Sequence, residues 1–187
     1  LVICVVIILL TPVRSHYNHC DHKQQHKEMI TITPYESALS EKIRKTNPKL
    51  TEAERIKIIQ AVEKHAPYFE KRVGLLGKIP RCLYYGLIHV ESHYNPSATS
   101  AAPARGLMQV TPIWRGHCQG YKVDEDLYQI DNAIKAGCQI LAGYLQRANG
   151  DLRTALAYYN AGPGGAKAGR GWDYAEKVLN AAANYEV

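Results

Sequence analysis

The chain of 187 residues lacks the sequence patterns of several common protein classes. No segment alternates apolar and polar residues convincingly and no internal repeat recurs, so neither a sheet nor a repeat architecture is expected. Glycine-rich phosphate loops and nucleophile elbows are absent, which argues against nucleotide-binding enzymes and serine hydrolases. The apolar run at residues 1–10 is too short to span a bilayer comfortably.

Zinc-enzyme and nucleic-acid motifs are also missing. His89 and His93 are spaced as metal ligands on a helix could be, but Val90 stands where zinc proteases place a glutamate. The net charge of +6 comes from scattered basic residues, so it favours solubility rather than a nucleic-acid partner. We therefore expect no metal and no cofactor. A loose metal site is an alternative for one cluster near the N-terminus: His16, His19, Cys20, His22 and His26.

Changes in composition predict three segments. Residues 1–15 have the length of a signal-peptide core, which predicts a signal peptide or membrane anchor and an exported, periplasmic or envelope-associated protein. Residues 16–49 are polar, rich in His and Lys and interrupted by Pro34 and Pro48, and are interpreted as a linker. Residues 50–187 are long enough for one folded domain, expected to be monomeric.

Four cysteines remain beyond the leader, an even number that an oxidising compartment could pair. We prefer a disulfide between Cys118 and Cys138, because it would join a loop to the following helix across a modest span. Free thiols packed as small hydrophobic groups are the alternative.

Helical periodicity dominates residues 50–187. Thr51 and Glu54 form a capping-box pattern, followed by apolar residues at helical spacing from Ile56 to Ala66. Similar spacing recurs over residues 82–91, 134–145, 152–159 and 174–182. The fold class predicted from these patterns is all-α.

Glu91 lies on the apolar side of one of these helices. The apolar stripe at positions 83, 84, 87 and 88 continues to 90 and 91, and Asn95-Pro96 ends the segment soon afterwards. Partial burial and the negative end of the helix dipole both favour the protonated acid, so we expect a raised pKa and a proton donor near neutral pH. A structural ion pair with a buried arginine or lysine is the alternative.

Two amide side chains occupy similar places near the ends of apolar segments. Gln109 follows Leu107-Met108, and Asn160 follows Tyr158-Tyr159. Amide and phenol groups beside an acid suit a neutral, hydroxyl-rich ligand such as a sugar. A capping role for Gln109 and a core role for the tyrosines are equally ordinary explanations.

Four motifs in order resemble the soluble-lytic-transglycosylase-like (SLT) domain family. The first two lie in ESHYNPSATSAAPARGLMQVTP (91–112), the third is ALAYYNAGPG (155–164) and the fourth is YAEKVL (174–179). Their joint occurrence is more specific than any single motif. The resemblance covers about residues 51–187. It implies a lysozyme-like helical fold that cleaves the β-1,4 bond between N-acetylmuramic acid and N-acetylglucosamine in peptidoglycan glycan strands.

The same resemblance implies roles for individual residues. Glu91 would be the sole acid/base, protonating the glycosidic oxygen and then deprotonating the muramic C6 hydroxyl to close a 1,6-anhydro ring. Tyr159 would orient or hydrogen-bond this acid, while Gln109 and Asn160 would hold the N-acetyl sugar. Ser92 would be largely structural. The residues expected to line the cleft are Ser100, Met108, Gln109, Tyr159, Asn160 and Tyr174.

Two other functions remain compatible with these residues. A lysozyme-type hydrolase on the same fold would use a second carboxylate to assist water, with Asp124, Glu125 and Asp126 as candidates. A catalytically inactive wall-binding module would keep the groove without turnover.

Overall fold

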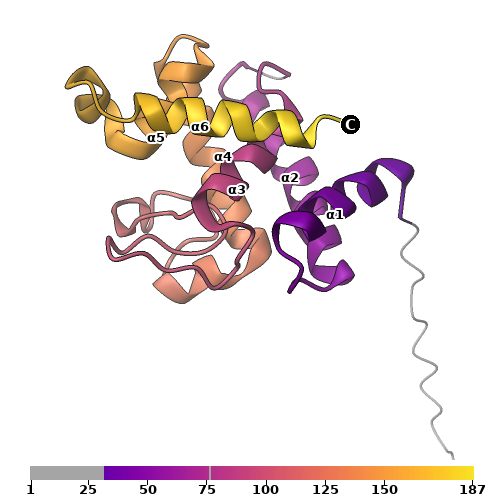
Figure 1. Cartoon of the computed structure of the whole chain (residues 1–187). Coiled ribbons are helices and arrows are strands. Elements are labelled where there is room, and N and C mark those ends of the chain that lie inside the picture. The colour runs from indigo at the N-terminus through magenta and orange to yellow at the C-terminus, as the bar shows by residue number, and fades with distance from the viewer. Residues whose placement is uncertain (1–31, 76) are drawn as a thin grey trace, which may run out of the picture. The chain divides into compact units, whose positions relative to one another are not determined.

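The computed structural model describes residues 32–75 and 77–187, and helices make up most of them (Figure 1). Within these residues the β-pairing consists of isolated bridges, which confirms the predicted all-α class. The α-helices are α1 (Pro34–Thr46), α2 (Glu52–Arg72), α3 (Arg81–Ser92), α4 (Ile130–Arg147), α5 (Leu152–Lys167) and α6 (Trp172–Ala182). Short 3₁₀ helices are η1 (Pro112–Trp114), η2 (Asp124–Tyr128) and η3 (Ala183–Tyr185).

Helix α1 corrects part of the predicted linker. Residues 34–46 are helical, with Pro34 in the first turn where its missing N–H costs nothing, and Leu39 and Ile43 are fully buried. A capping box between Thr33 and Glu36 starts the helix. Two buried apolar residues on one face were enough to dock an otherwise polar helix, so the folded domain begins before residue 50. Residues 1–31, including the predicted leader and the histidine cluster, lie outside the described part of the chain.

The predicted capping box at the start of α2 is confirmed. Thr51 Oγ1 accepts a hydrogen bond from the Glu54 N–H at 3.2 Å, and the Glu54 carboxylate accepts one from the Thr51 N–H at 2.8 Å. The predicted apolar face is buried and packs against α4. The α2 N-terminus and its core face therefore follow from local sequence alone.

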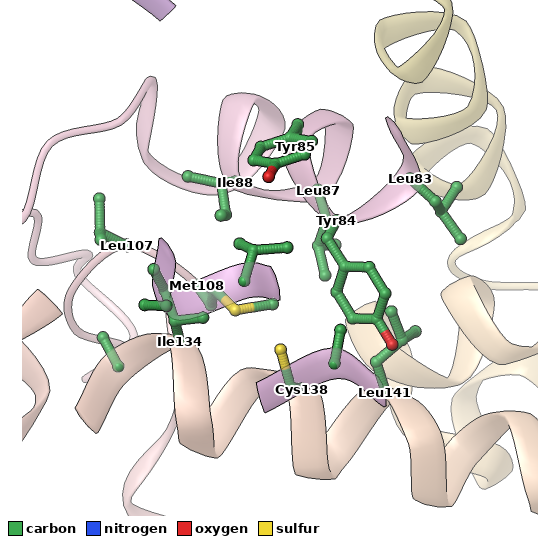
Figure 2. Packing of buried hydrophobic residues seen from close by; sticks show 14 of the residues in the cluster. Leu83, Tyr84, Tyr85, Leu87, Ile88, Leu107, Met108, Ile134, Cys138 and Leu141 are labelled. Carbon is green, nitrogen blue, oxygen red and sulfur yellow. The ribbon is translucent and has the colours of Figure 1, made fainter. Parts of the chain in front are cut away.

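Helix α3 carries Glu91 and lies between α4 and α6. Figure 2 shows Tyr84 and Leu87 pointing from α3 toward Cys138 and Leu141 of α4, with the sulfur of Met108 between the two helices. On its other side α3 packs against α6, which in turn packs against α5 (Figure 1). The two helices that flank α3 thus fix the position of its C-terminal turn.

Gly86 allows α3 and α6 to approach closely. A Cβ atom at this position would lie 2.6 Å from the backbone N and 2.8 Å from the Cα of Ala182. Both are backbone atoms, so the contact could be relieved only by moving a helix. The missing side chain of Gly86 therefore sets the distance at which α6 crosses the acid-bearing helix.

The preferred disulfide is wrong. Cys118 and Cys138 are separate free thiols, as is Cys82. Cys118 and Cys138 are buried in the hydrophobic core, which raises the pKa of the Cys118 thiol to about 11. They pack as small apolar side chains, which was the alternative to a disulfide in the sequence analysis.

No helix within the described residues has both the length and the apolar character needed to cross a membrane.

Candidate active site

Glu91 lies in the last turn of α3, as its place in the apolar stripe predicts. The helix ends because His93 adopts a left-handed conformation with φ of 49°, and its N–H bonds the His89 carbonyl at 2.9 Å. Tyr94 follows with φ of 58°, a second left-handed residue, and its ring is buried. Two consecutive non-glycine residues in this region are unfavourable, so tertiary packing must hold the sharp exit behind the acid.

The carboxyl group of Glu91 is only partly accessible to solvent. Burial raises its pKa from the ordinary value of 4.5 to about 7, and a hydrogen bond from Tyr174 acts in the opposite direction. The structural ion pair considered as an alternative is not found among the described residues. A carboxyl with this pKa exchanges its proton near neutral pH, which is the requirement for acid–base work.

Tyr174 is the hydrogen-bond partner of the acid. Its hydroxyl lies in the first turn of α6 and donates to Glu91 Oε1. Burial and the adjacent Glu91 charge raise the pKa of Tyr174 well above its ordinary value, so the phenol stays protonated and can donate. Tyr174 thus stabilises the ionised form of the acid.

Tyr159 makes a different hydrogen bond from the one considered in the sequence analysis. Its hydroxyl donates to the main-chain oxygen of Met108 at 2.9 Å, not to the acid. Burial and, after it, the negative charge of Glu91 raise the pKa of Tyr159 well above its ordinary value. The hydrogen bond predicted as one alternative for Tyr159 is made by Tyr174, and an orienting role for Tyr159 stays a prediction.

The turn that carries Gln109 is anchored to the end of α3. Ser92 Oγ donates to the Leu107 carbonyl at 2.8 Å, which confirms its structural role. Arg105 and Val110 exchange two backbone hydrogen bonds of 3.1 Å and close a small hairpin around residues 106–109. The acid and the turn are therefore parts of one rigid unit.

Gln109 is held with its amide nitrogen turned inward. Nε2 donates to the carbonyls of Ala98 (3.2 Å) and Gly106 (3.0 Å), which fixes the side chain and leaves Oε1 to accept from a ligand. Its φ of 45° is left-handed, so a strained backbone orients this residue. The arrangement suits an acceptor for an amide N–H or a sugar hydroxyl.

Three other predicted cleft residues differ in accessibility. Met108 is fully buried and packs against Gly137 of α4, so its side chain supports the turn and does not face a ligand. Ser100 is exposed, but its hydroxyl donates to the Ala102 carbonyl within its own loop. Asn160 is exposed on α5. Of these three residues, Asn160 presents the most available polar side chain.

A known family model matches the part of the chain that carries this site. Residues 71–179 match the family model described as the transglycosylase SLT domain, which is more than half of the chain. The chain belongs to this family. The match runs from the end of α2 into α6 and includes Glu91, the Gln109 turn and Tyr174. The family resemblance seen in the sequence is therefore confirmed.

Two relatives place the SLT domain in context. The membrane-bound lytic murein transglycosylase F of Pasteurella multocida (strain Pm70) is 32% identical over 107 residues, covering 54% of this chain. The chain spans only 20% of that relative's length. The 70 kDa soluble lytic transglycosylase SLT70 of Escherichia coli superposes with a TM-score of 0.51 at 22% identity, over 78% of this chain and 32% of that one. At this identity the structural match supports the fold, in agreement with the implied lysozyme-like helical domain.

Proposed function

We propose that this SLT domain is a peptidoglycan lytic transglycosylase in which Glu91 is the single acid/base. The observation that carries the proposal is the Glu91 carboxyl itself, whose pKa is about 7 and whose partner is the Tyr174 hydroxyl. A relative named as a lytic murein transglycosylase and membership of the SLT family support the choice of substrate. Action at the cell envelope follows from that substrate.

The proposed reaction needs two proton transfers by one group. Protonated Glu91 donates to the glycosidic oxygen as the bond between N-acetylmuramic acid and N-acetylglucosamine breaks. The resulting carboxylate accepts a hydrogen bond from Tyr174, which stabilises it until the second step. It then takes the proton of the C6 hydroxyl while that oxygen attacks C1, forming 1,6-anhydro-N-acetylmuramic acid and restoring the acid.

The surrounding residues bind the substrate in this proposal. Gln109 Oε1 and the exposed Asn160 amide hold the N-acetyl sugar, and Ser100 lies at the rim. Tyr159 fixes the Gln109 turn through the Met108 carbonyl, so it positions the binding group without touching the acid. No cofactor enters the mechanism.

Contacts within the acidic loop engage two of the three residues that a hydrolase could use as its second carboxylate. Asp124 binds Arg115 (2.6 Å) and the Tyr121 hydroxyl (2.9 Å), and Asp126 accepts backbone N–H bonds from residues 122 and 123. These contacts hold the pKa of both carboxyls below its usual range. Asp124 and Asp126 are therefore engaged within their own loop, and of the three candidate carboxylates the exposed Glu125 has no such contact among the described residues.

Digestion of purified peptidoglycan tests the proposal. The full chain, Glu91→Gln and the control Glu52→Gln, which changes an exposed acid at the start of α2, are compared by mass spectrometry of the released muropeptides. We expect 1,6-anhydro ends from the wild type and the control, and a loss of at least a thousandfold in Glu91→Gln. Reducing ends would assign the hydrolase instead. If the wild-type chain binds peptidoglycan but releases no muropeptides, the wall-binding module would be favoured.

A further inference from the structure

A concave site that includes none of the candidate active-site residues lies between the C-terminal ends of α2 and α4 and the short helix η1. Its volume is about 400 Å³. We call it the arginine pocket. Phe69, Trp114 and Tyr144 contribute its aromatic surface, and Arg72 and Arg147 lie at its edge. None of these residues has a role in the reaction proposed above.

A row of aromatic rings leads from the arginine pocket to α5. The Trp114 and Tyr144 rings meet edge to face, with centroids 5.8 Å apart, and Tyr144 meets Tyr158 at 6.0 Å. Tyr158 precedes Tyr159, the residue that binds the turn beside the acid. The row therefore extends the aromatic surface of the pocket to α5, the helix that also carries Tyr159 and Asn160 of the candidate active site.

The two arginines carry charge that is not neutralised within the described residues. Neither guanidinium has a carboxylate oxygen within 4.0 Å among residues 32–75 and 77–187. Arg72 is nevertheless held in place, because one of its nitrogens donates to the Tyr68 hydroxyl at 3.1 Å. Its other N–H groups remain for a ligand.

Helix dipoles explain why basic residues are found at the ends of α2 and α4, but they do not explain why these two arginines line the pocket. Arg72 and Arg147 end α2 and α4, where cations are favoured by the partial negative charge of the helix terminus. Lys71 satisfies the same preference one residue earlier and does not line the pocket. Both planar guanidinium groups line the same concave aromatic surface, and such an arrangement can bind a carboxylate on an organic body.

We propose that the arginine pocket binds the carboxylates of the peptide stems that branch from the glycan strand. The choice of this ligand rests on the proposed function. The sugars at the acid are recognised by neutral amide groups, so the positive charge of the pocket complements the free carboxylates of the peptide branch. Each arginine can form two parallel hydrogen bonds with a carboxylate, while the rings pack against the aliphatic parts of the peptide.

Binding of a free peptide tests the proposal without involving catalysis. The probe is the tripeptide L-Ala-γ-D-Glu-L-Lys, titrated into the full chain with the Glu91→Gln substitution and followed by the indole N–H resonances. The chain has two tryptophans. Trp114 lies in the pocket, and Trp172 serves as an internal reference because its indole N–H is bonded to the Ala166 carbonyl at 3.2 Å. We expect the Trp114 signal to shift and the Trp172 signal to stay.

Three comparisons make the outcome decisive. Adding Arg72→Gln and Arg147→Gln together is expected to weaken binding at least tenfold, whereas Lys71→Gln should change it less than twofold. The same tripeptide with both carboxyls amidated should bind the unaltered pocket at least tenfold more weakly. Equal binding of the amidated peptide, or an unmoved Trp114 signal, would overturn the proposal.

The result is independent of the reaction at Glu91. The tripeptide contains no glycosidic bond, so it reports on the pocket even if the protein cleaves nothing. Binding without peptidoglycan cleavage would refute the proposed function and retain the pocket. Cleavage without peptide binding would do the reverse.

Discussion

Two opposing influences act on the Glu91 carboxyl. Burial at the end of α3 disfavours its charged form, and the Tyr174 hydroxyl favours that form by donating a hydrogen bond. Burial is the larger influence, so the pKa is raised to about 7. At neutral pH the Glu91 carboxyl is therefore present in both its protonated and its ionised form. The ionised form lowers the free energy of unfolding.

Glu91→Gln should stabilise the fold at alkaline pH and change it little at pH 4. The unfolded carboxyl titrates near 4.5 and the folded one near 7, so the folded state binds more protons between these values. The stability of the wild type therefore falls as pH rises through this window, by roughly 3 kcal/mol, and the variant lacks this loss. Denaturant unfolding at pH 4 and pH 8.5 measures the difference. The same pH dependence in both proteins would contradict the raised pKa.

Tyr174→Phe should move the alkaline limit of activity to higher pH. Removing the hydroxyl removes the influence that lowers the pKa of Glu91, so the acid stays protonated further into the alkaline range. The rate of peptidoglycan solubilisation against pH measures this limit. Tyr159→Phe is the matched control, because its hydroxyl binds a backbone carbonyl instead. An equal shift in both variants would show that the Tyr174 hydrogen bond does not set the pKa.

At the scale of elements, the site depends on how α4 supports the Gln109 turn. Met108 is buried against Gly137. A Cβ atom added to Gly137 would lie 2.2 Å from the sulfur and 2.7 Å from the Cβ of Met108. The sulfur could rotate away, but the Cβ of Met108 is fixed to the backbone of the turn. The absence of a side chain at Gly137 therefore sets the height of the turn above α4.

Gly137→Ala should destabilise the protein by about 1–3 kcal/mol and lower activity by displacing Gln109. Gly143→Ala is the control on the same helix, since nothing lies within 4 Å of its Cβ position. That change should stabilise the helix by up to about 1 kcal/mol through propensity alone. Thermal unfolding and the digestion assay measure both. Similar effects of the two substitutions would argue against close packing at Met108.

Local periodicity predicted features that depend on a single helix. It did not predict contacts between side chains of different helices. The buried face of α2, its capping box and the position of Glu91 all depend on spacing within a single segment. The donor to Glu91 could not be found in this way, because Tyr159 and Tyr174 are both near the acid and only the crossing of α6 over α3 decides between them. The burial of Met108 likewise depends on the approach of α4.

At the scale of the whole domain, α1 belongs to the folded unit. Lys42 Nζ donates to the carbonyls of Asn184 (2.9 Å) and Glu186 (2.8 Å), and Thr46 shares a hydrogen bond of 2.9 Å with the Tyr185 hydroxyl. These contacts join the first described helix to the last residues of the chain. The docking of α1 could not be predicted from the polar composition of residues 32–49, because its contacts join residues about 140 positions apart and no local pattern indicates them.

Leu39→Ala should therefore cost 2–5 kcal/mol of unfolding free energy, the range for truncating a fully buried leucine. Lys45→Ala, an exposed position on the same helix, should have an effect below about 0.5 kcal/mol. Denaturant unfolding of the full chain distinguishes the two. A Leu39 variant as stable as the wild type would restore the linker interpretation.

The most direct test of the account is the titration of the Glu91 carboxyl by carbon-13 NMR in the full chain, with the resonance assigned by its absence in Glu91→Gln. We predict a midpoint near 7, because burial outweighs the Tyr174 hydrogen bond. A midpoint near 4.5 would show an ordinary solvated carboxylate. Such a group would be ionised at neutral pH, and the single-residue acid–base mechanism would then lose its proton donor.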